Sequence, residues 1–149
     1  MKFLCKQKGV AAVELGILLF PLLLLTFGVT ELGRAFYQYN SLAKATRDAV
    51  RFLSSQGPGD AVDLATAKCL AVYGKRTCSG SVLLPGLTQG MVTVCDSSNC
   101  ADHLNQSTTT GVINLVTVTI TGYPFSSMVP FLVPDITFGP ISTTMRQVL

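Results

Sequence analysis

The anchoring and the fold of this chain are decided by one stretch, KGVAAVELGILLFPLLLLTFGVT, which spans residues 8–30. In it, Gly9 is preceded by a basic residue and followed by a single carboxylate, Glu14, and then by an uncharged apolar run over residues 15–30. The wider apolar region, 10–33, is long enough to cross a bilayer, which takes about 20 residues of helix. The stretch therefore predicts a membrane helix that begins beside a short basic leader.

Three kinds of segment fit this N-terminus. A secretory signal peptide is the weakest, because no small-residue cleavage site follows the apolar run at the right distance. An uncut signal anchor and a prepilin-type segment, cut after Gly9 with its helix kept in the membrane, both remain. Basic residues before the run favour a cytoplasmic N-terminus, and those after it weaken that bias. They are Lys2, Lys6 and Lys8 before it, and Arg34, Lys44, Arg47 and Arg51 after it.

Glu14 bears on the choice between these two segments. A carboxylate near the edge of a membrane helix is costly and tends to have a partner. Cleavage after Gly9 would give Val10 a free amine one helical turn before Glu14, at a helix N-terminus, where the macrodipole already favours an anion. The amine of a neighbouring subunit could then pair with Glu14 during assembly. The alternative is a Glu14 that extends into the lipid headgroups, and the spacing alone does not separate the two.

The residues around Gly9 resemble the processing site of a class III type IV prepilin, with Gly9 before the cut and Glu14 at the fifth position after it. The motifs that follow are similar to those of the TadE-like family, minor pseudopilins of the tight-adherence (Flp) pilus, from Lys8 to about Ser54. These motifs are Pro21-Leu22-Leu23-Leu24-Leu25, Phe27-Gly28-Val29-Thr30-Glu31-Leu32-Gly33-Arg34-Ala35, Tyr39-Asn40 and Ala45-Thr46-Arg47-Asp48-Ala49-Val50-Arg51. One departure is Lys6-Gln7-Lys8, where the family often has two arginines.

The resemblance implies a function in pilus assembly. A prepilin peptidase would cut between Gly9 and Val10, and Glu14 would act in assembly. The implied partners are the lipid bilayer, other pseudopilins, the major pilin and the inner-membrane assembly platform. The chain would lie in the bacterial inner membrane with a cytoplasmic N-terminus and a periplasmic domain. The alternative is a signal-anchored periplasmic binding or sensor module that keeps its leader.

The chain divides into a leader (1–9), a membrane and amphipathic helix (10–54) and a small α+β domain (55–149). Beyond the membrane, Phe36, Ala43, Val50 and Leu53 recur at helical spacing. Glu31 and Arg34 are spaced to pair where the helix leaves the bilayer, close to the aromatic residues Phe36, Tyr37 and Tyr39. Gly57-Pro58-Gly59 ends this helix, and a second helix from Ala61 to about Tyr73 is expected, with Asp60 as its N-cap and Gly74 after it.

Strand patterns occupy the rest of the domain. Residues 91–94, 116–121 and 141–148 predict an antiparallel sheet of three or four strands packed on the long helix, in a type IV pilin-like α+β fold. The polar segment 96–111 reads as a surface loop. The segment 123–134 is too apolar for an ordinary loop, and it either folds into the core or forms an exposed patch for a partner subunit or the membrane surface.

The charge balance bears on nucleic-acid binding, and the cysteines bear on disulfides and metal sites. Three of the 11 basic residues lie in the leader, so the remaining chain carries 8 basic and 8 acidic residues and has no basic face for nucleic acid. Four cysteines follow the membrane segment and predict two disulfides, with buried free thiols as the alternative. Of three connectivities we favour Cys69–Cys78 with Cys95–Cys100, because turn-forming residues lie within each pair. The zinc alternative is weaker, because no C-x-x-C spacing exists and His103 is the only imidazole.

The sequence holds no nucleophile motif, no phosphate-binding glycine loop and no paired acids in a plausible pocket. Asp102 and His103 are adjacent in the polar segment, and we expect both to be solvated rather than catalytic. The chain is therefore expected to have no cofactor, no metal and no enzymatic activity.

Overall fold

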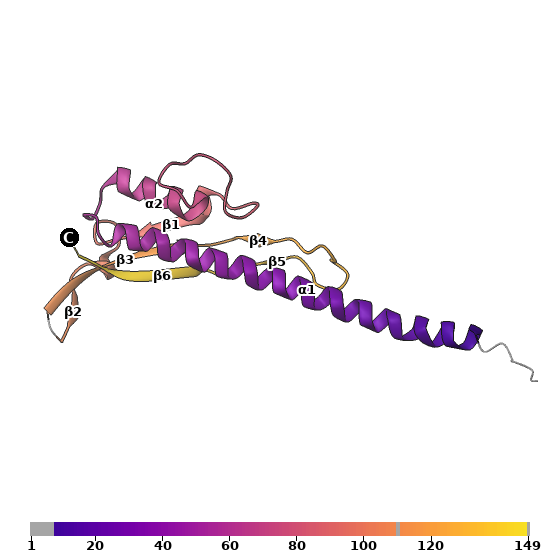
Figure 1. Cartoon of the computed structure of the whole chain (residues 1–149). Coiled ribbons are helices and arrows are strands. Elements are labelled where there is room, and N and C mark those ends of the chain that lie inside the picture. The colour runs from indigo at the N-terminus through magenta and orange to yellow at the C-terminus, as the bar shows by residue number, and fades with distance from the viewer. Residues whose placement is uncertain (1–7, 110, 149) are drawn as a thin grey trace, which may run out of the picture.

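The spine of the molecule is helix α1, Lys8–Leu53, in a computed structural model that describes residues 8–109 and 111–148. At 1.5 Å per residue, its 46 residues form a rod about 70 Å long. Pro21 lies inside the helix, which continues through it. The N-terminal half extends well beyond the rest of the fold (Figure 1). Of the leader predicted over residues 1–9, all but the last two residues, and Cys5 with them, lie outside the described residues.

The main sheet is built around β3, Gly111–Ile120. Strand β1, Val92–Cys95, and strand β6, Ile141–Gln147, both pair antiparallel with the same part of β3, so they flank it on opposite edges. The strict alternation predicted for β3 is confirmed, because its apolar members are buried: Val116, Val118 and Ile120. The alternation predicted for β6 is also present, with Ile141 buried and Ser142 exposed.

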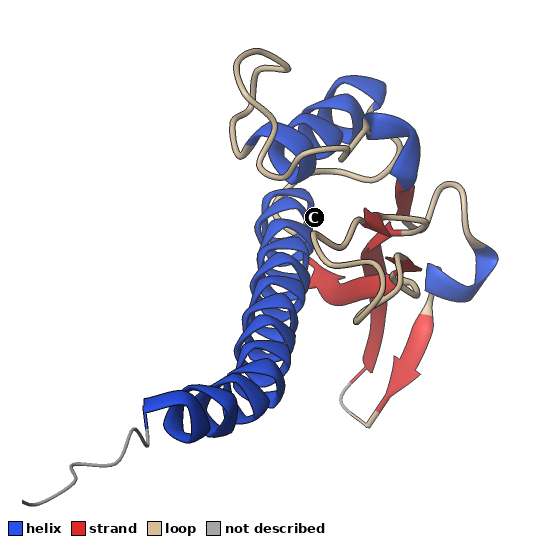
Figure 2. Cartoon of the chain, turned by 90° about the vertical axis from the view of Figure 1, so that its right-hand side faces the viewer, coloured by secondary structure: helices blue, strands red, loops and turns tan. Residues whose placement is uncertain are grey.

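The second helix, α2, spans Ala61–Tyr73 as predicted. The carboxylate of Asp60 caps it by accepting hydrogen bonds from the amides of Val62 and Asp63, at 2.7 and 3.4 Å. Gly74 ends it in the left-handed conformation, with φ of 67°, which a glycine adopts without steric cost. Figure 2 shows α2 over the C-terminal end of α1, with the strands along one side of that helix.

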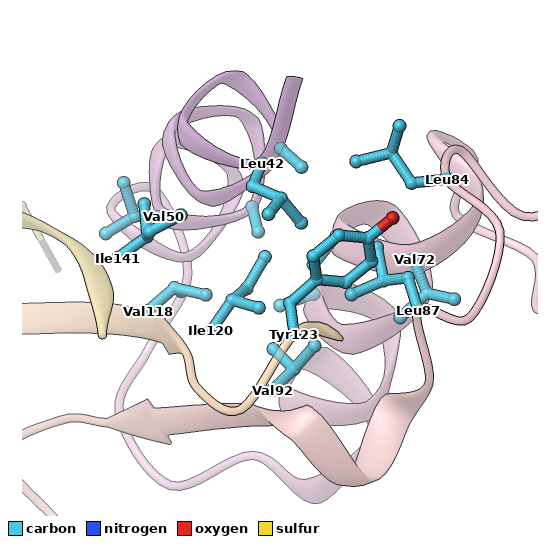
Figure 3. Packing of buried hydrophobic residues seen from close by; sticks show 14 of the residues in the cluster. Leu42, Val50, Val72, Leu84, Leu87, Val92, Val118, Ile120, Tyr123 and Ile141 are labelled. Atoms are coloured by element: carbon cyan, nitrogen blue, oxygen red, sulfur yellow. The ribbon is translucent and has the colours of Figure 1, made fainter. Parts of the chain in front are cut away.

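The core lies between the distal half of α1, helix α2 and one face of the sheet (Figure 3). Tyr123 is the largest of its fully buried side chains, and its hydroxyl donates a hydrogen bond to the carbonyl of Pro85 at 3.0 Å. The α+β arrangement expected from the sequence, a long helix and a short helix packed on an antiparallel sheet, is confirmed. The residues that α1 contributes to the core are Leu42, Ala45, Ala49, Val50 and Leu53.

The structure differs from the sequence pattern at two places. Phe36 shares the helical spacing of Ala43, Val50 and Leu53, but its side chain is exposed, because the apolar residues that α1 buries in the core begin only at Leu42. Residues 96–111 were read as a surface loop, but they include the short helix η2, Ala101–His103, and strand β2, Gln106–Thr108. Strand β2 pairs with the start of β3. Its side chains are polar and mostly exposed, so no apolar alternation marks it in the sequence.

Three further short elements complete the fold. The 3-10 turn η1, Gln89–Met91, leads into β1. Strands β4, Pro124–Phe125, and β5, Ile136–Thr137, pair with each other in a separate two-stranded ribbon. We call residues 123–138 the β4–β5 hairpin. It leaves the main sheet and runs beside α1 toward the N-terminal half of that helix (Figure 1).

Candidate assembly and membrane-exit site

The N-terminal half of α1 presents apolar side chains to its surroundings on every side. Large residues from Val10 to Val29 are mostly exposed, and none of the most apolar 18-residue window is buried in the protein. In the part of the chain that the structure describes, this is one helix long and apolar enough to cross a membrane, judged by length and composition. Helix α1 is therefore a candidate single membrane anchor.

The predicted processing and assembly residues lie together at the start of α1. Val10 and Glu14 are four residues apart, so they lie on the same face of the helix, and both are exposed. No hydrogen bond or ion pair joins Glu14 to another described residue. A Cβ added to Gly9 would meet no atom within 4 Å, so the fold itself places no steric demand on a glycine there.

A second group of residues lies where α1 leaves its apolar segment. The predicted Glu31–Arg34 ion pair is confirmed, with 3.2 Å between Glu31 Oε2 and Arg34 Nη2. Both side chains also hold the β4–β5 hairpin. The amide of Met128 donates to Glu31 Oε1 at 3.0 Å, and Arg34 donates to the carbonyl of Ser126. We call these four residues, Glu31, Arg34, Ser126 and Met128, the exit clasp.

Because Glu31 is buried, its contacts attach the β4–β5 hairpin firmly to α1. Glu31 is only 3% exposed, and a buried carboxylate is tolerated when it is paired and hydrogen-bonded. The guanidinium of Arg34 also lies over the ring of Phe125, 4.9 Å from its centroid. Burial raises the pKa of the Tyr123 hydroxyl, and the charge of Arg34 opposes that rise. The hairpin is thus fixed to α1 by charge, backbone and ring contacts at one level of the helix.

Each of the two alternatives raised for residues 123–134 holds for a part of the segment. Tyr123 and Phe125 are buried in the fold, whereas Met128 and Phe131 are exposed at the tip. Sequence reasoning found the Glu31–Arg34 pair but missed Ser126 and Met128, because they act through backbone groups that leave no signature in residue type. The unusual apolarity of the segment was the available signal.

Both disulfides of the structure follow the sequence-local pairing. Cys69–Cys78 joins α2 to the loop after it, and Cys95–Cys100 closes the loop after β1. His103 is not simply solvated, as expected, but partly buried. Its Nε2 lies 2.7 Å from Thr117 Oγ1, and its Nδ1 lies 3.8 Å from Cys95 Sγ.

A metal would find few free ligands in this loop. The ligand atoms of Cys95, Cys100 and His103 lie within 4.8 Å of one another. Both sulfurs are engaged in the disulfide, so the oxidised loop offers a single imidazole, and a zinc site needs at least three protein ligands. The arrangement acts chemically as a covalent loop closure.

Comparison with protein families gives one match, to the model described as TadE-like protein, over residues 9–51. The N-terminal helix of this chain is TadE-like. The matched segment begins at Gly9, contains Glu14 and the Glu31–Arg34 pair, and stops two residues before α1 ends. The resemblance to the TadE-like family read from the sequence is thereby confirmed over this segment. Comparison with curated proteins and with solved structures gives no match.

The TadE-like segment and the rest of the chain divide the candidate site between them. The helix contributes Gly9, Val10, Glu14, Glu31 and Arg34, whereas the hairpin that completes the exit clasp lies far outside the match. The N-terminal end of the site has side chains without partners in the described chain, and the exit clasp has partners for each of its charges. The residues at the start of α1 can therefore pair with another molecule, whereas the exit clasp joins two parts of this chain.

Proposed function

We propose that this protein is a minor pseudopilin of a bacterial tight-adherence (Flp) pilus. It is made as a membrane precursor with a cytoplasmic N-terminus, and a prepilin peptidase cuts it between Gly9 and Val10. Helix α1 then holds it in the inner membrane, where it assembles with other pseudopilins and the major pilin on the assembly platform. It acts as a structural component and has no catalytic role.

The observation that carries this proposal is the position of Glu14 on a TadE-like helix. Its carboxylate lies on an otherwise apolar, exposed surface and has no partner among the described residues. A charge within a membrane helix costs about 3 kcal/mol or more at the bilayer centre and less near its edge. A partner from outside the chain would remove that cost. The new amine of Val10 in a neighbouring subunit supplies the required positive charge.

The orientation is supported by the disulfides. Two disulfides follow α1 in the chain, and disulfides persist in oxidising compartments such as the periplasm. A periplasmic domain places the start of α1 in the cytoplasm, where the basic residues before Gly9 also favour it. The signal-anchored sensor or binding module predicts the same orientation, so processing is the property that separates the two functions.

Mass spectrometry of the membrane-extracted protein, from cells with an active prepilin peptidase, tests processing directly. The expected N-terminus is Val10. Gly9→Ala should leave the uncut form accumulating, and Gly16→Ala is its matched control. Neither substitution meets an atom within 4 Å in the protein, so a difference between them reflects recognition by the peptidase and not folding. An intact Met1 in the unmodified protein would contradict the pseudopilin proposal and favour the signal-anchored binding or sensor module, which keeps its leader.

The assembly role of Glu14 has a separate test. Glu14→Ala should still be cut after Gly9, because the substitution leaves the processing site in place, yet pilus formation should fail or fall sharply. Glu14→Asp keeps the charge and should restore much of it. Fibres seen by electron microscopy in normal numbers with Glu14→Ala would show that charge pairing at this position is dispensable.

A further inference from the structure

The tip of the β4–β5 hairpin lies against the last turns of the apolar segment of α1. Leu132 Cδ2 is 3.7 Å from the point that a Cβ on Gly28 would occupy, and the amide of Met128 binds Glu31. The hairpin therefore carries residues 127–133, which we call the hairpin tip, back from the domain to the level of Gly28–Glu31. Strand β4 leads the chain along α1 toward the tip, and β5 returns beside it (Figure 1).

The level of Gly28 is set by the length of the membrane helix. From Val10 to Gly28 the helix rises by about 27 Å, close to the roughly 30 Å of a bilayer's hydrocarbon core. With the start of α1 at one boundary, Gly28 and Glu31 lie at the other. Glu31 can lie there because Arg34 and the Met128 amide neutralise and solvate its carboxylate. The hairpin tip is thus held at the boundary between headgroups and acyl chains.

The hairpin tip is built for an apolar environment. Met128 is 76% exposed and Phe131 is 80% exposed, and residues 128–134 carry no charge. The one acid beside them, Asp135, is turned back to accept a hydrogen bond from the Ser127 amide at 2.7 Å. Leaving two such side chains in water forgoes the favourable free energy of burying them.

Backbone amides of the tip also form hydrogen bonds within the protein, as a segment that enters lipid requires. The amides of Leu132 and Val133 both donate to the carbonyl of Val129, at 2.9 and 3.0 Å. Backbone groups that enter a bilayer must be satisfied within the protein, and this turn meets much of that demand. The tip contacts α1 at Gly28 through Leu132, and Phe27 and Leu32 of α1, close to Gly28 in the chain, are also exposed.

We propose that the hairpin tip is a second membrane contact, in which Met128 and Phe131 insert into the acyl region of the leaflet on the domain side. The occupant of this surface is lipid and not a second protein, because the tip lies against the membrane helix at the level of the bilayer boundary. Two contacts, α1 and the tip, would fix the tilt and the rotation of the domain on the bilayer surface. The inference needs α1 to span the membrane but does not need the pilus function.

The chain has no tryptophan, so each introduced tryptophan is a single reporter. Phe131→Trp tests the tip, and Val112→Trp, at an exposed position on the strand that pairs with β2, is the matched control. Leu18→Trp, exposed in the middle of the apolar segment, reports insertion of α1 itself. Because Phe131 and Val112 are exposed, neither change should alter the fold, which the thermal unfolding midpoint checks.

The full chain is reconstituted in vesicles of phosphatidylcholine and phosphatidylglycerol, with bromine atoms on the acyl chains of one set. Bromines in both leaflets make the result independent of which way the protein inserts. Phe131→Trp should emit at shorter wavelength than Val112→Trp and lose about half of its emission to the brominated chains, as expected for a side chain 5–10 Å below the interface, while Val112→Trp is unaffected.

Four results would overturn the inference. If Phe131→Trp emits like Val112→Trp and escapes the bromines, the tip lies in water. A short-wavelength emission without bromine quenching would mean that the tip packs on a second protein molecule. Equal quenching at both positions would mean that the whole domain lies on the membrane without a specific tip contact. Failure of Leu18→Trp to be quenched would remove the anchor and this inference together, whereas the processing test on Gly9 is read independently.

Discussion

At the scale of single residues, Asp96 connects the loop after β1 to the turn before α2. Its Oδ2 accepts a hydrogen bond from the Gly59 amide at 3.0 Å, and its Oδ1 accepts from the amide and the hydroxyl of Ser98, at 2.9 and 2.6 Å. Burial alone would raise the pKa of this carboxyl, but the hydrogen bonds to its charged form outweigh burial and lower the pKa below 3.8. The ionised form is therefore part of the folded structure.

Asp96→Asn should lower the free energy of unfolding at pH 7 by about 1–3 kcal/mol, because the amide has a single acceptor oxygen and its NH2 group cannot accept the remaining hydrogen bond. A carboxyl with a lowered pKa stabilises the fold above its unfolded pKa, and this contribution is lost as the pH falls through the folded pKa. The difference between the two proteins should thus shrink below pH 3.8. Urea unfolding in mild detergent at pH 7 and at pH 3 measures it, with the exposed Asp102→Asn as control. An equal difference at both pH values would assign the effect to shape and not to charge.

At the scale of elements, β3 organises the sheet and supplies the face that packs on α1. Val118, where β3 pairs with both β1 and β6, is fully buried, whereas Val112, on the same strand, is 63% exposed. Val118→Ala should lower the free energy of unfolding by about 2–3 kcal/mol through lost burial and a residual cavity. Val112→Ala should change it by less than about 0.5 kcal/mol. Thermal or urea unfolding compares the pair, and equal losses would contradict the claim that burial of Val118 against α1 causes the difference.

Elements that have a period in the sequence could be predicted, and those held by tertiary contacts could not. The alternation of Val116, Val118 and Ile120 and the cap at Asp60 gave β3 and α2 correctly, because each depends on local spacing. Strand β2 is polar on both faces, so only its pairing with β3 defines it. The i,i+3 spacing found the Glu31–Arg34 pair, but the exit clasp needs Met128, which is 97 residues from Glu31.

At the scale of the whole molecule, one helix serves both the membrane and the domain core. The sequence divides naturally near residue 54, but the core crosses that point, because α1 contributes residues from Leu42 to Leu53 to it. The end of the chain is tied back to the same helix, since the Val148 amide donates to the Ser54 carbonyl and Gln147 donates to the Gln56 carbonyl. Anchor and domain are therefore mechanically continuous, and a force on α1 reaches the sheet directly.

This continuity predicts how truncated chains behave. A fragment of residues 29–149 keeps the exit clasp and the buried stripe of α1, so it should fold and unfold in one cooperative transition in mild detergent. A fragment of residues 55–149 retains both disulfides and every strand, yet it lacks the helix that covers Val116 and Val118. Losing that surface exposes much of the core to water, so a broad, non-cooperative transition is expected.

Circular dichroism during heating distinguishes these outcomes, with the near-ultraviolet signal of the buried Tyr123 reporting tertiary packing. A matched control is residues 29–149 with Phe36→Ala, which removes an exposed aromatic from the same helix and should leave the transition almost unchanged. If the shorter fragment melts as sharply as the longer one, the sheet and α2 form a core of their own. Helix α1 would then be a tether for the domain and not its spine, and the rigid link from the membrane to the sheet would be lost with it.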